Sequence, residues 1–251
     1  MIILDTHVHM YPSYDAGKLL RLCSQRLHAL VPDAVPVACL TERYDCHFYA
    51  ALCERGLPEN QHVIGCEILE NGRAVMIRFG QGVPPLFVLP GRQIATSDGL
   101  EVHCIGNDAA IADGFTTQET IGRCRELDAL AVLPWGVGKW LFRRRRIVEK
   151  MLSIFSPSDL ILGDSAMRPV IWPEPLPMRR GRANGFRILA GSDPLPHEKS
   201  GTWIGRYATL ADMRFDAECP SRTCLRALQE AKLSHLGVRP WPVGFAKRMA
   251  G

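Results

Sequence analysis

Two histidines near the start of the chain have the residue type and spacing of a metal site. His7 and His9 are separated by one residue and follow the short apolar run Ile2–Leu4. Side chains two residues apart in an extended segment point to the same side. Both imidazoles can therefore reach one divalent ion through neutral ring nitrogens. Asp5 precedes them by the same step and could orient one imidazole. The alternative is a pair of polar residues that only end a strand.

Asp193, far along the chain, also follows a predicted strand. The segment Arg187–Ala190 reads as a strand, and Asp193 follows it by three residues. Active-site residues of parallel α/β folds lie just beyond the carboxyl ends of strands, so we predict that Asp193 reaches the same rim as His7 and His9. Two imidazoles and one carboxylate suit Zn²⁺, Mn²⁺ or Fe²⁺. Asp193 could instead cap a turn, because Ser-Asp-Pro is also a turn sequence.

Two basic residues are candidates for holding an anionic substrate. Lys139 lies in the glycine-containing segment Trp135–Trp140, directly after an apolar run. Arg168 follows Gly163-Asp164-Ser165, another strand end, and could clamp a phosphate through two hydrogen bonds. We assign catalysis to Asp193, Lys139 and Arg168, with both basic residues binding substrate. A lysine in a glycine-containing loop can equally well be only exposed.

The elements that must position these residues alternate between strands and helices. Roughly the first quarter of the chain reads strand, helix, strand, helix, and residues 115–251 return to this alternation. Alternation implies parallel strands joined by crossover helices. Between them, residues 62–106 carry short β-type runs separated by Asn71-Gly72 and Asp98-Gly99, both strong hairpin signals. We predict one α/β domain over residues 1–251, a distorted TIM-like barrel with an inserted β-hairpin region.

The individual elements are predicted from hydrophobic periodicity and capping residues. Strands are expected at Ile2–Leu4, Val35–Leu40, Val63–Leu69, Ala74–Phe79, Leu86–Leu89, Arg92–Thr96, Leu100–Ile105, Ala129–Leu133, Leu160–Leu162 and Arg187–Ala190. Helices are expected after Asp15 up to Leu30 and at Phe48–Arg55, Thr117–Leu127, Arg145–Phe155 and Ser221–Lys232. A long loop is expected over Pro169–Pro177.

Composition narrows the class of protein. The 251 residues are 47% hydrophobic and 22% charged, as in a globular protein with a sizeable core. A net charge of +4 fits a small anionic substrate and does not by itself argue for nucleic acid. The run Arg143–Arg146 reads as a solvated helix start, so we do not expect a nucleic-acid partner. Nine scattered cysteines without a Cys-x-x-Cys pair exclude a zinc ribbon and a full disulfide framework. We expect a cytoplasmic protein with reduced thiols, no leader peptide and no membrane partner. Oligomeric state stays open.

Three segments together resemble the polymerase and histidinol phosphatase (PHP) domain family. Asp5-Thr6-His7-Val8-His9 resembles its opening motif. Leu89–Gly106 resembles the stretch from a Gly-x-Glu metal motif to a Glu-Val-His strand, and Gly191-Ser192-Asp193 resembles a closing Ser-Asp-x-His motif. The resemblance implies a distorted (β/α)7 barrel, up to three metal ions and phosphoester hydrolysis. It implies that His7, His9 and Asp193 hold one metal and that His103 serves a neighbouring site.

The chain also departs from this pattern. Arg43, Gln93 and Leu133 stand where the family has metal ligands, and after Asp193 the expected histidine is displaced to His197. A neutral amide is a weak ligand that does not offset two cations. Glu67, as a further metal ligand, could compensate, and so could the nearby pair Asp45 and His47.

We therefore predict a metal-dependent hydrolase, a phosphoesterase of a small anionic substrate. A first alternative is an amidohydrolase-like enzyme that cleaves C–N or C–O bonds, in which a carbamylated Lys139 would bind metal. A second alternative is a family member that has lost activity and only binds a ligand or partner.

Overall fold

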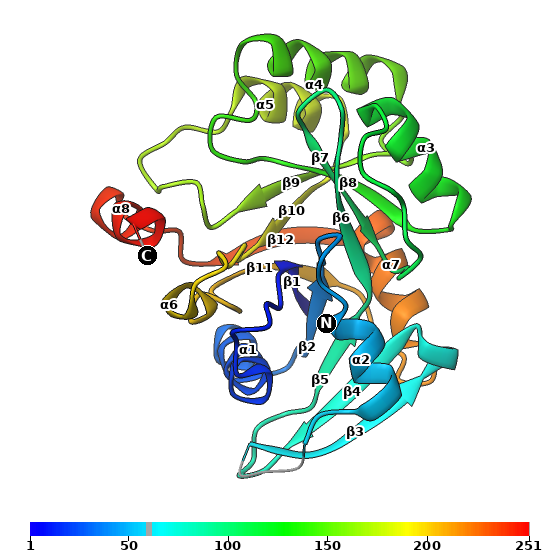
Figure 1. The fold of residues 1–251 in the computed structure, drawn as a ribbon, viewed down its shortest axis with the longest axis vertical. Helices are drawn as coiled ribbons and strands as arrows, with labels where there is room; N and C mark the ends of the chain where they lie inside the picture. The colour runs from blue at the N-terminus through cyan, green and yellow to red at the C-terminus, as the bar shows by residue number, and fades with distance from the viewer. Residues whose placement is uncertain (59–61, 251) are drawn as a thin grey trace.

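The computed structural model describes residues 1–58 and 62–250, apart from the side chains of residues 247, 248 and 250. Its strands form two mixed sheets (Figure 1). The seven-stranded sheet has the order β12 (Lys232–Gly237), β11 (Tyr207–Asp212), β1 (Ile2–Val8), β2 (Val35–Leu40), β5 (Leu86–Leu89), β4 (Ala74–Phe79) and β3 (Val63–Leu69). The five-stranded sheet has the order β10 (Ile188–Gly191), β9 (Ile161–Ser165), β8 (Leu130–Pro134), β7 (Glu101–Ile105) and β6 (Gly91–Ala95).

The predicted (β/α)7 barrel is wrong. Strand β1 pairs with β2 in parallel on one edge and with β11 in antiparallel fashion on the other. Both edges of β1 are therefore paired, so β1 has no free edge to which β10 could pair to close a ring. The expected parallel alternation after residue 115 holds only for β8, β9 and β10. Strand β11 pairs antiparallel with β1 and with β12, so the last two strands of the chain extend the first sheet.

Two glycines let the sheets meet closely. A side chain at Gly91 would lie 2.3 Å from the carbonyl oxygen of Leu40, at the point where β6 approaches β2. A side chain at Gly191 would lie 2.5 Å from the backbone nitrogen of His7, where β10 approaches β1. Contacts of this length exclude any side chain at either position. The carboxyl ends of β1 and β10 are consequently held side by side, and this contact brings distant parts of the chain to one site.

Several local predictions are confirmed. Helix α1 (Ala16–Leu30) begins after Asp15, whose side chain accepts a hydrogen bond from the Lys18 backbone. Helix α3 (Thr117–Glu126) begins with a capping box between Thr116 and Glu119. The two predicted hairpins also form, because β3 pairs antiparallel with β4 and β6 with β7.

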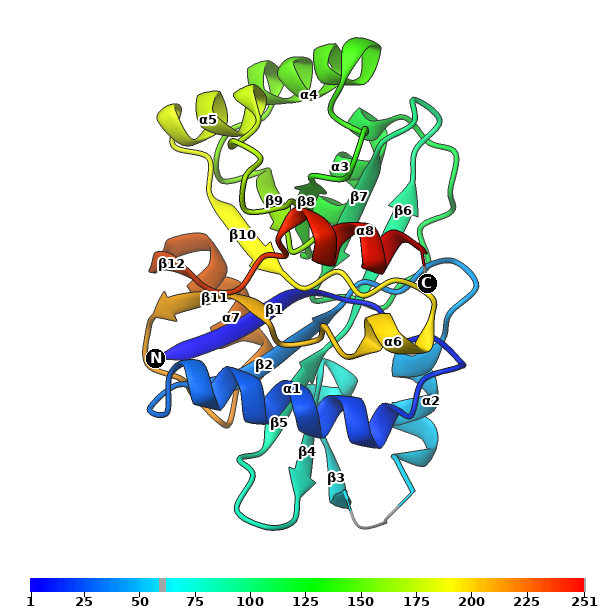
Figure 2. The same cartoon turned by 90° about the vertical axis from the view of Figure 1, so that its left-hand side faces the viewer.

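Helices cover both sheets. Helices α3, α4 (Phe142–Ile154) and α5 (Leu176–Ala183) lie over the five-stranded sheet, and α1 lies along the seven-stranded sheet (Figures 1 and 2). The remaining helical segments are α2 (Phe48–Arg55), η1 (Glu70–Gly72), α6 (Glu198–Gly201), α7 (Pro220–Glu230) and α8 (Pro242–Ala250). The start of α5 shortens the loop expected over Pro169–Pro177. Helix α8 crosses the region where the sheets meet (Figure 2).

The apolar core lies in layers on either side of the sheets. One cluster packs α1 on the first sheet through Leu20, Cys23 and Leu27, all fully buried. A second packs α3 and α4 on the other sheet, and a third includes Cys224 and Leu228 of α7. All nine cysteines are free. Among the described residues, no helix combines the length and apolarity needed to cross a membrane.

Candidate metal centre

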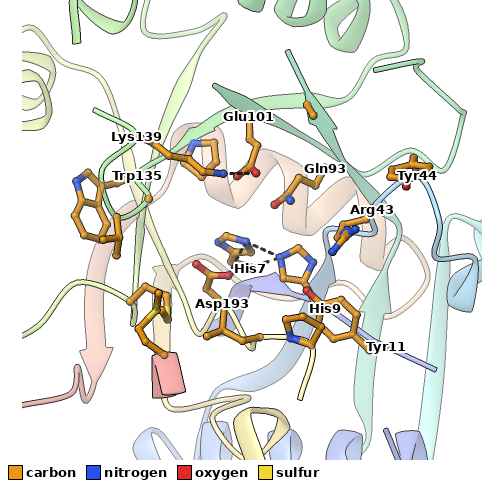
Figure 3. A pocket seen from close by; sticks show the side chains of 18 of the residues that line it. His7, His9, Tyr11, Arg43, Tyr44, Gln93, Glu101, Trp135, Lys139 and Asp193 are labelled. Atoms are coloured by element: carbon orange, nitrogen blue, oxygen red, sulfur yellow. Dashed lines mark hydrogen bonds and ion pairs between the residues drawn. The ribbon is translucent and has the colours of Figure 1, made fainter. Parts of the chain in front are cut away.

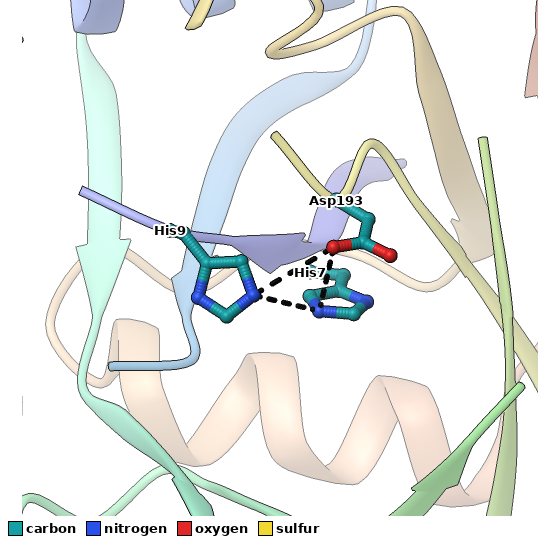
Figure 4. Close-up of side chains that lie close together, drawn as sticks. All are labelled: His7, His9 and Asp193. Atoms are coloured by element: carbon teal, nitrogen blue, oxygen red, sulfur yellow. Dashed lines mark hydrogen bonds and ion pairs between the residues drawn. The ribbon is translucent and has the colours of Figure 1, made fainter. Parts of the chain in front are cut away.

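Strand β1 delivers both histidines to the meeting point of the sheets. All seven residues of β1 are buried, and His9 follows the strand directly. The Nε2 atoms of His7 and His9 are 3.1 Å apart (Figure 4). Their rings lie edge to face with centroids 4.9 Å apart. The two-residue spacing therefore places both imidazoles on one side, as predicted.

Asp193 joins them from the loop after β10. Its Oδ1 lies 3.4 Å from Nε2 of His7 and 3.7 Å from Nε2 of His9. The residue has φ = 51°, a left-handed conformation that costs free energy for a residue with a side chain, although aspartate tolerates it better than most. Its backbone nitrogen donates to the carbonyl oxygen of His7 at 2.9 Å, which helps to hold this conformation. Strain at a candidate site is a common mark of function.

The three side chains fit one divalent cation. One ligand atom from each of His7, His9 and Asp193 lies within 4.8 Å of the others, and both histidines are buried. Burial, and next the neighbouring His7, lower the pKa of His9 to about 3. His9 is therefore neutral at physiological pH, as a metal ligand must be. Two neutral imidazoles and a carboxylate form a donor set that binds Zn²⁺, Mn²⁺ and Fe²⁺.

Asp5 acts on the backbone rather than on an imidazole. The carboxylate is fully buried and accepts hydrogen bonds from the backbone nitrogens of Ser192 (2.8 Å), Gly205 (2.8 Å) and His7 (3.3 Å). Burial raises the pKa of Asp5 to about 6, although hydrogen bonds from the Ser192 side chain and from these N–H groups lower it in part. Asp5 was predicted to orient an imidazole ligand. It instead positions Ser192, the residue before Asp193.

His103 lies beside the three ligands but has a partner of its own. Its ring packs edge to face on His7 with centroids 4.2 Å apart. Its Nε2 lies 3.1 Å from Oε1 of Gln93, on the paired strand β6. Burial, and then the nearby His7 and His9, lower the pKa of His103 well below its usual value. His103 is thus beside the three candidate ligands, and its Nε2 is engaged by the neutral amide of Gln93.

A cavity of about 440 Å³ opens above these residues (Figure 3). Lys139 lines it and forms an ion pair with Glu101 of β7, and Trp135 stands on the same side (Figure 3). Arg43 lines the opposite side and pairs with Asp45 at 3.3 Å. Tyr11 also lines the cavity, and burial raises its pKa above the usual range. The cavity therefore offers basic groups on two sides of the candidate ligands.

The other basic candidate lies elsewhere. Arg168 is buried, and its guanidinium binds both carboxylate oxygens of Asp164 at 2.8 and 2.5 Å. A third N–H of Arg168 donates to the carbonyl oxygen of Trp172, and Tyr207 donates to the same carboxylate. Because its donors are directed inside the protein, Arg168 is not among the residues that line the cavity. The substrate clamp predicted for Arg168 is corrected to a buried ion pair.

The proposed substitute ligands also lie away from the three-ligand group. Glu67 is on the edge strand β3, about half exposed, and pairs with Arg78 at 3.0 Å. His197 accepts a hydrogen bond from the Ser200 backbone and caps α6. Asp45 pairs with Arg43, and His47 lies at the start of α2. The structure brings together His7, His9, Asp193, His103 and Lys139 and separates Glu67 and Arg168 from them.

Two cavity residues were missed although the same spacing rule identifies them. Tyr11 follows His9 by two residues, and their ring centroids are 5.6 Å apart. Glu101 precedes His103 by two residues on β7 and so shares its face of the sheet. Continuing the alternation from 7 and 9 to 11, and from 103 back to 101, predicts both residues.

Comparison with known proteins finds a structure with a similar fold but gives no information on activity. No protein family model and no curated protein sequence matches the chain. Among solved structures, it is similar to the crystal structure of PsfC from Pseudomonas syringae PB-5123, with a TM-score of 0.62 and 15% sequence identity. The match covers 99% of this chain and 96% of PsfC. At this identity, the likeness shows a shared fold and nothing of the activity, and the resemblance to the PHP family stays a prediction.

Proposed function

We propose that the protein is a metal-dependent hydrolase that cleaves phosphoesters of small anionic substrates. In this proposal His7, His9 and Asp193 hold one Zn²⁺, Mn²⁺ or Fe²⁺ ion. The observation that carries it is the convergence of two buried imidazoles and a carboxylate at the base of a cavity. When bound, a metal ion of this kind supplies an acidified water molecule and polarises the scissile bond.

The remaining cavity residues would bind and orient the substrate. Lys139, held by Glu101, would neutralise negative charge on one side, and Arg43 would do so on the other. Trp135 and Met167 give the cavity apolar walls that limit water. Arg168 has no part in this proposal, because its guanidinium is bound to Asp164. The nine free thiols suit a reducing environment, and we propose the cytoplasm as the compartment.

A second candidate is a protein that binds an anionic ligand without turnover. Among the described residues, one group of three can hold a metal, and the amide of Gln93 faces His103. A single ion does not clamp both the attacking and the leaving oxygen as a metal pair does. The carbamylated-lysine alternative is less favoured, because Nζ of Lys139 is engaged by Glu101.

The test combines metal content with hydrolysis. Protein purified without affinity tag or chelator is expected to contain about one divalent ion per chain and to hydrolyse p-nitrophenyl phosphate faster when Mn²⁺ or Zn²⁺ is added. The double variant His7→Ala/His9→Ala should lose both properties, whereas His28→Ala/His62→Ala should keep them. Bound metal without turnover of any phosphoester would favour the binding protein. Unchanged metal content in the first variant would contradict both candidates.

A further inference from the structure

A second cavity of about 250 Å³ adjoins the candidate metal centre. Tyr44, Gln93 and Asp113 line both cavities. Gln93 connects the second cavity to the ligands, because its amide is bonded to His103 and His103 packs on His7. The shared walls indicate one elongated site with the metal ligands near its middle. Figure 3 shows Tyr44, Arg43 and Gln93 on one side of these ligands and Lys139 on the other.

The walls of the second cavity suit a flat apolar group. Ala110, Ile111 and Ala112 provide aliphatic surface from the loop after β7. At the junction of the cavities the Tyr44 side chain is 69% exposed, so its ring is accessible for stacking. His47 adds a polar group that could bond a ring nitrogen or hydroxyl. This combination is typical of a ligand site, with mostly apolar walls and a few placed polar groups.

Two buried charged residues hold these walls in place. Glu42 is 1% exposed and accepts hydrogen bonds from the backbone nitrogens of Phe48 (2.6 Å) and Tyr49 (3.1 Å). Arg92 donates to the carbonyl oxygen of Cys46 at 2.8 Å and pairs with Asp108 at 3.4 Å. Backbone hydrogen bonds also join Glu42 to both neighbours of Arg92 in the chain. The second cavity is therefore preformed, and a ligand loses little free energy in ordering it.

We propose that the second cavity binds an aromatic or heteroaromatic ring in the alcohol portion of a phosphate monoester, while the phosphate lies over His7, His9 and Asp193. The position of the phosphate rests on the proposed function; the ring site rests on the cavity walls. A ring that stacks on Tyr44 and packs on Ile111 buries apolar surface away from water, which favours binding. The site then selects its substrate by ring as well as by charge.

Binding tests the ring site without requiring turnover. Benzylphosphonate and ethylphosphonate carry the same anionic group and differ in the ring, and neither is a phosphoester. Calorimetry on the Mn²⁺-loaded protein should show about tenfold tighter binding of benzylphosphonate, the gain expected for burying part of a ring. Tyr44→Ala and Ile111→Ser should bring the two affinities together, whereas Ile64→Ser, an exposed change on β3, should not. Equal affinities in the natural protein, or no binding of either compound, would overturn the ring site.

Turnover separates this inference from the proposed function. Benzyl phosphate and ethyl phosphate release alcohols of similar acidity, so a difference in kcat/KM reports ring binding. We expect benzyl phosphate to be favoured about tenfold, Tyr44→Ala to bring the two kcat/KM values together, and the exposed change Ile64→Ser to keep the preference. Ring-dependent phosphonate binding without hydrolysis of either ester would support the ring site and contradict the proposed function. Hydrolysis of both esters at equal rates would contradict the ring site alone.

Discussion

Asp5 and Ser192 are joined by a hydrogen bond across 187 positions of the sequence, at a distance of 2.8 Å between the Asp5 carboxylate and the Ser192 nitrogen. The second carboxylate oxygen of Asp5 accepts from Gly205. One buried side chain therefore fixes the loop that carries Asp193 against the strand that carries His7. The geometry of the candidate metal site depends on a residue that touches none of the ligand atoms.

Replacing Asp5 should loosen the site without removing a ligand. In Asp5→Ala, the buried N–H groups of His7, Ser192 and Gly205 lose their acceptor, which costs about 1–3 kcal/mol each in unfolding free energy. Metal affinity should fall by about 10–100-fold, the usual effect of losing an outer partner of a metal site. Calorimetric titration with Zn²⁺ measures this change. Asp33→Ala, at an exposed position, is the control. Equal Zn²⁺ affinities in both variants would show that Asp193 is held by other contacts.

The pH dependence of the metal-free protein should report the buried imidazoles. The pKa of His9 falls from about 6.5 in the unfolded chain to about 3 in the fold. Its stabilising contribution is therefore complete above pH 6.5 and is lost as the pH falls toward 3, at about 1.4 kcal/mol per pH unit. His103 acts in the same direction. Urea unfolding of chelator-treated protein between pH 8 and 4 should show stability falling with acid.

Asp5 should oppose this trend in a defined window. Its pKa is raised from 3.8 to about 6, so the folded state binds a proton that the unfolded chain has lost, and stability falls as the pH rises from 4 to 6. In the metal-free protein, Asp5→Asn should therefore steepen the acid loss, and His9→Gln should flatten it. Identical slopes in all three proteins would contradict the charge states assigned to both residues.

Arg168 should affect stability and not substrate binding. Removing one partner of a buried ion pair costs about 3–5 kcal/mol because the other charge is left unpaired. We therefore expect Arg168→Ala to lower the unfolding free energy by this amount through Asp164. The KM of any hydrolysed phosphoester should stay unchanged in the folded fraction. Arg143→Ala, an exposed change on α4, should alter stability by less than about 0.5 kcal/mol. A raised KM in a stable Arg168→Ala protein would restore the predicted clamp.

Lys139 should show the opposite pattern. It lines the cavity, is partly exposed and is held by Glu101. Lys139→Met keeps the length of the side chain and removes its charge, so KM for a phosphoester should rise about tenfold, equivalent to about 1.4 kcal/mol. Metal content and stability should change little. Lys150→Met on α4 is the matched control. A Lys139→Met enzyme with unchanged KM would mean that Lys139 serves only its pair with Glu101.

The sequence predicted what depends on nearby residues. The Asp15 cap, the Thr116 and Glu119 capping box and the Asn71-Gly72 turn each depend on residues at most five positions apart, and all three are confirmed. The meeting of His7, His9 and Asp193 also agrees with the prediction. It followed from strand ends and residue types, although the barrel that was expected to bring them together does not exist.

What failed depends on pairing between distant segments. The barrel does not close because β11 pairs with the edge of β1 that closure would need. Strand β11 was not recognised in the sequence. Glu67 was wrongly predicted to reach the metal site. Alternation along β3 does not show which face of the strand packs on the protein, and β3 is an edge strand. Arg168 was misplaced because its residue type fits a phosphate clamp and a buried pair with Asp164 equally well. The direction of its side chain depends on the surrounding fold.

Gln93 provides the sharpest test of how many metal ions the site can hold. Its Oε1 lies 3.1 Å from Nε2 of His103, which packs on His7. An amide oxygen is a weak ligand, whereas a carboxylate adds the negative charge that a second cation requires. Gln93→Glu should therefore raise the metal content above that of the natural protein when both are dialysed against Mn²⁺ and measured by elemental analysis. Gln93→Met, of similar size without a ligand oxygen, should bind no more metal than the natural protein. If Gln93→Glu also binds no additional Mn²⁺, His103 is unavailable as a ligand, and the neutral amide is not what limits the site to a single ion.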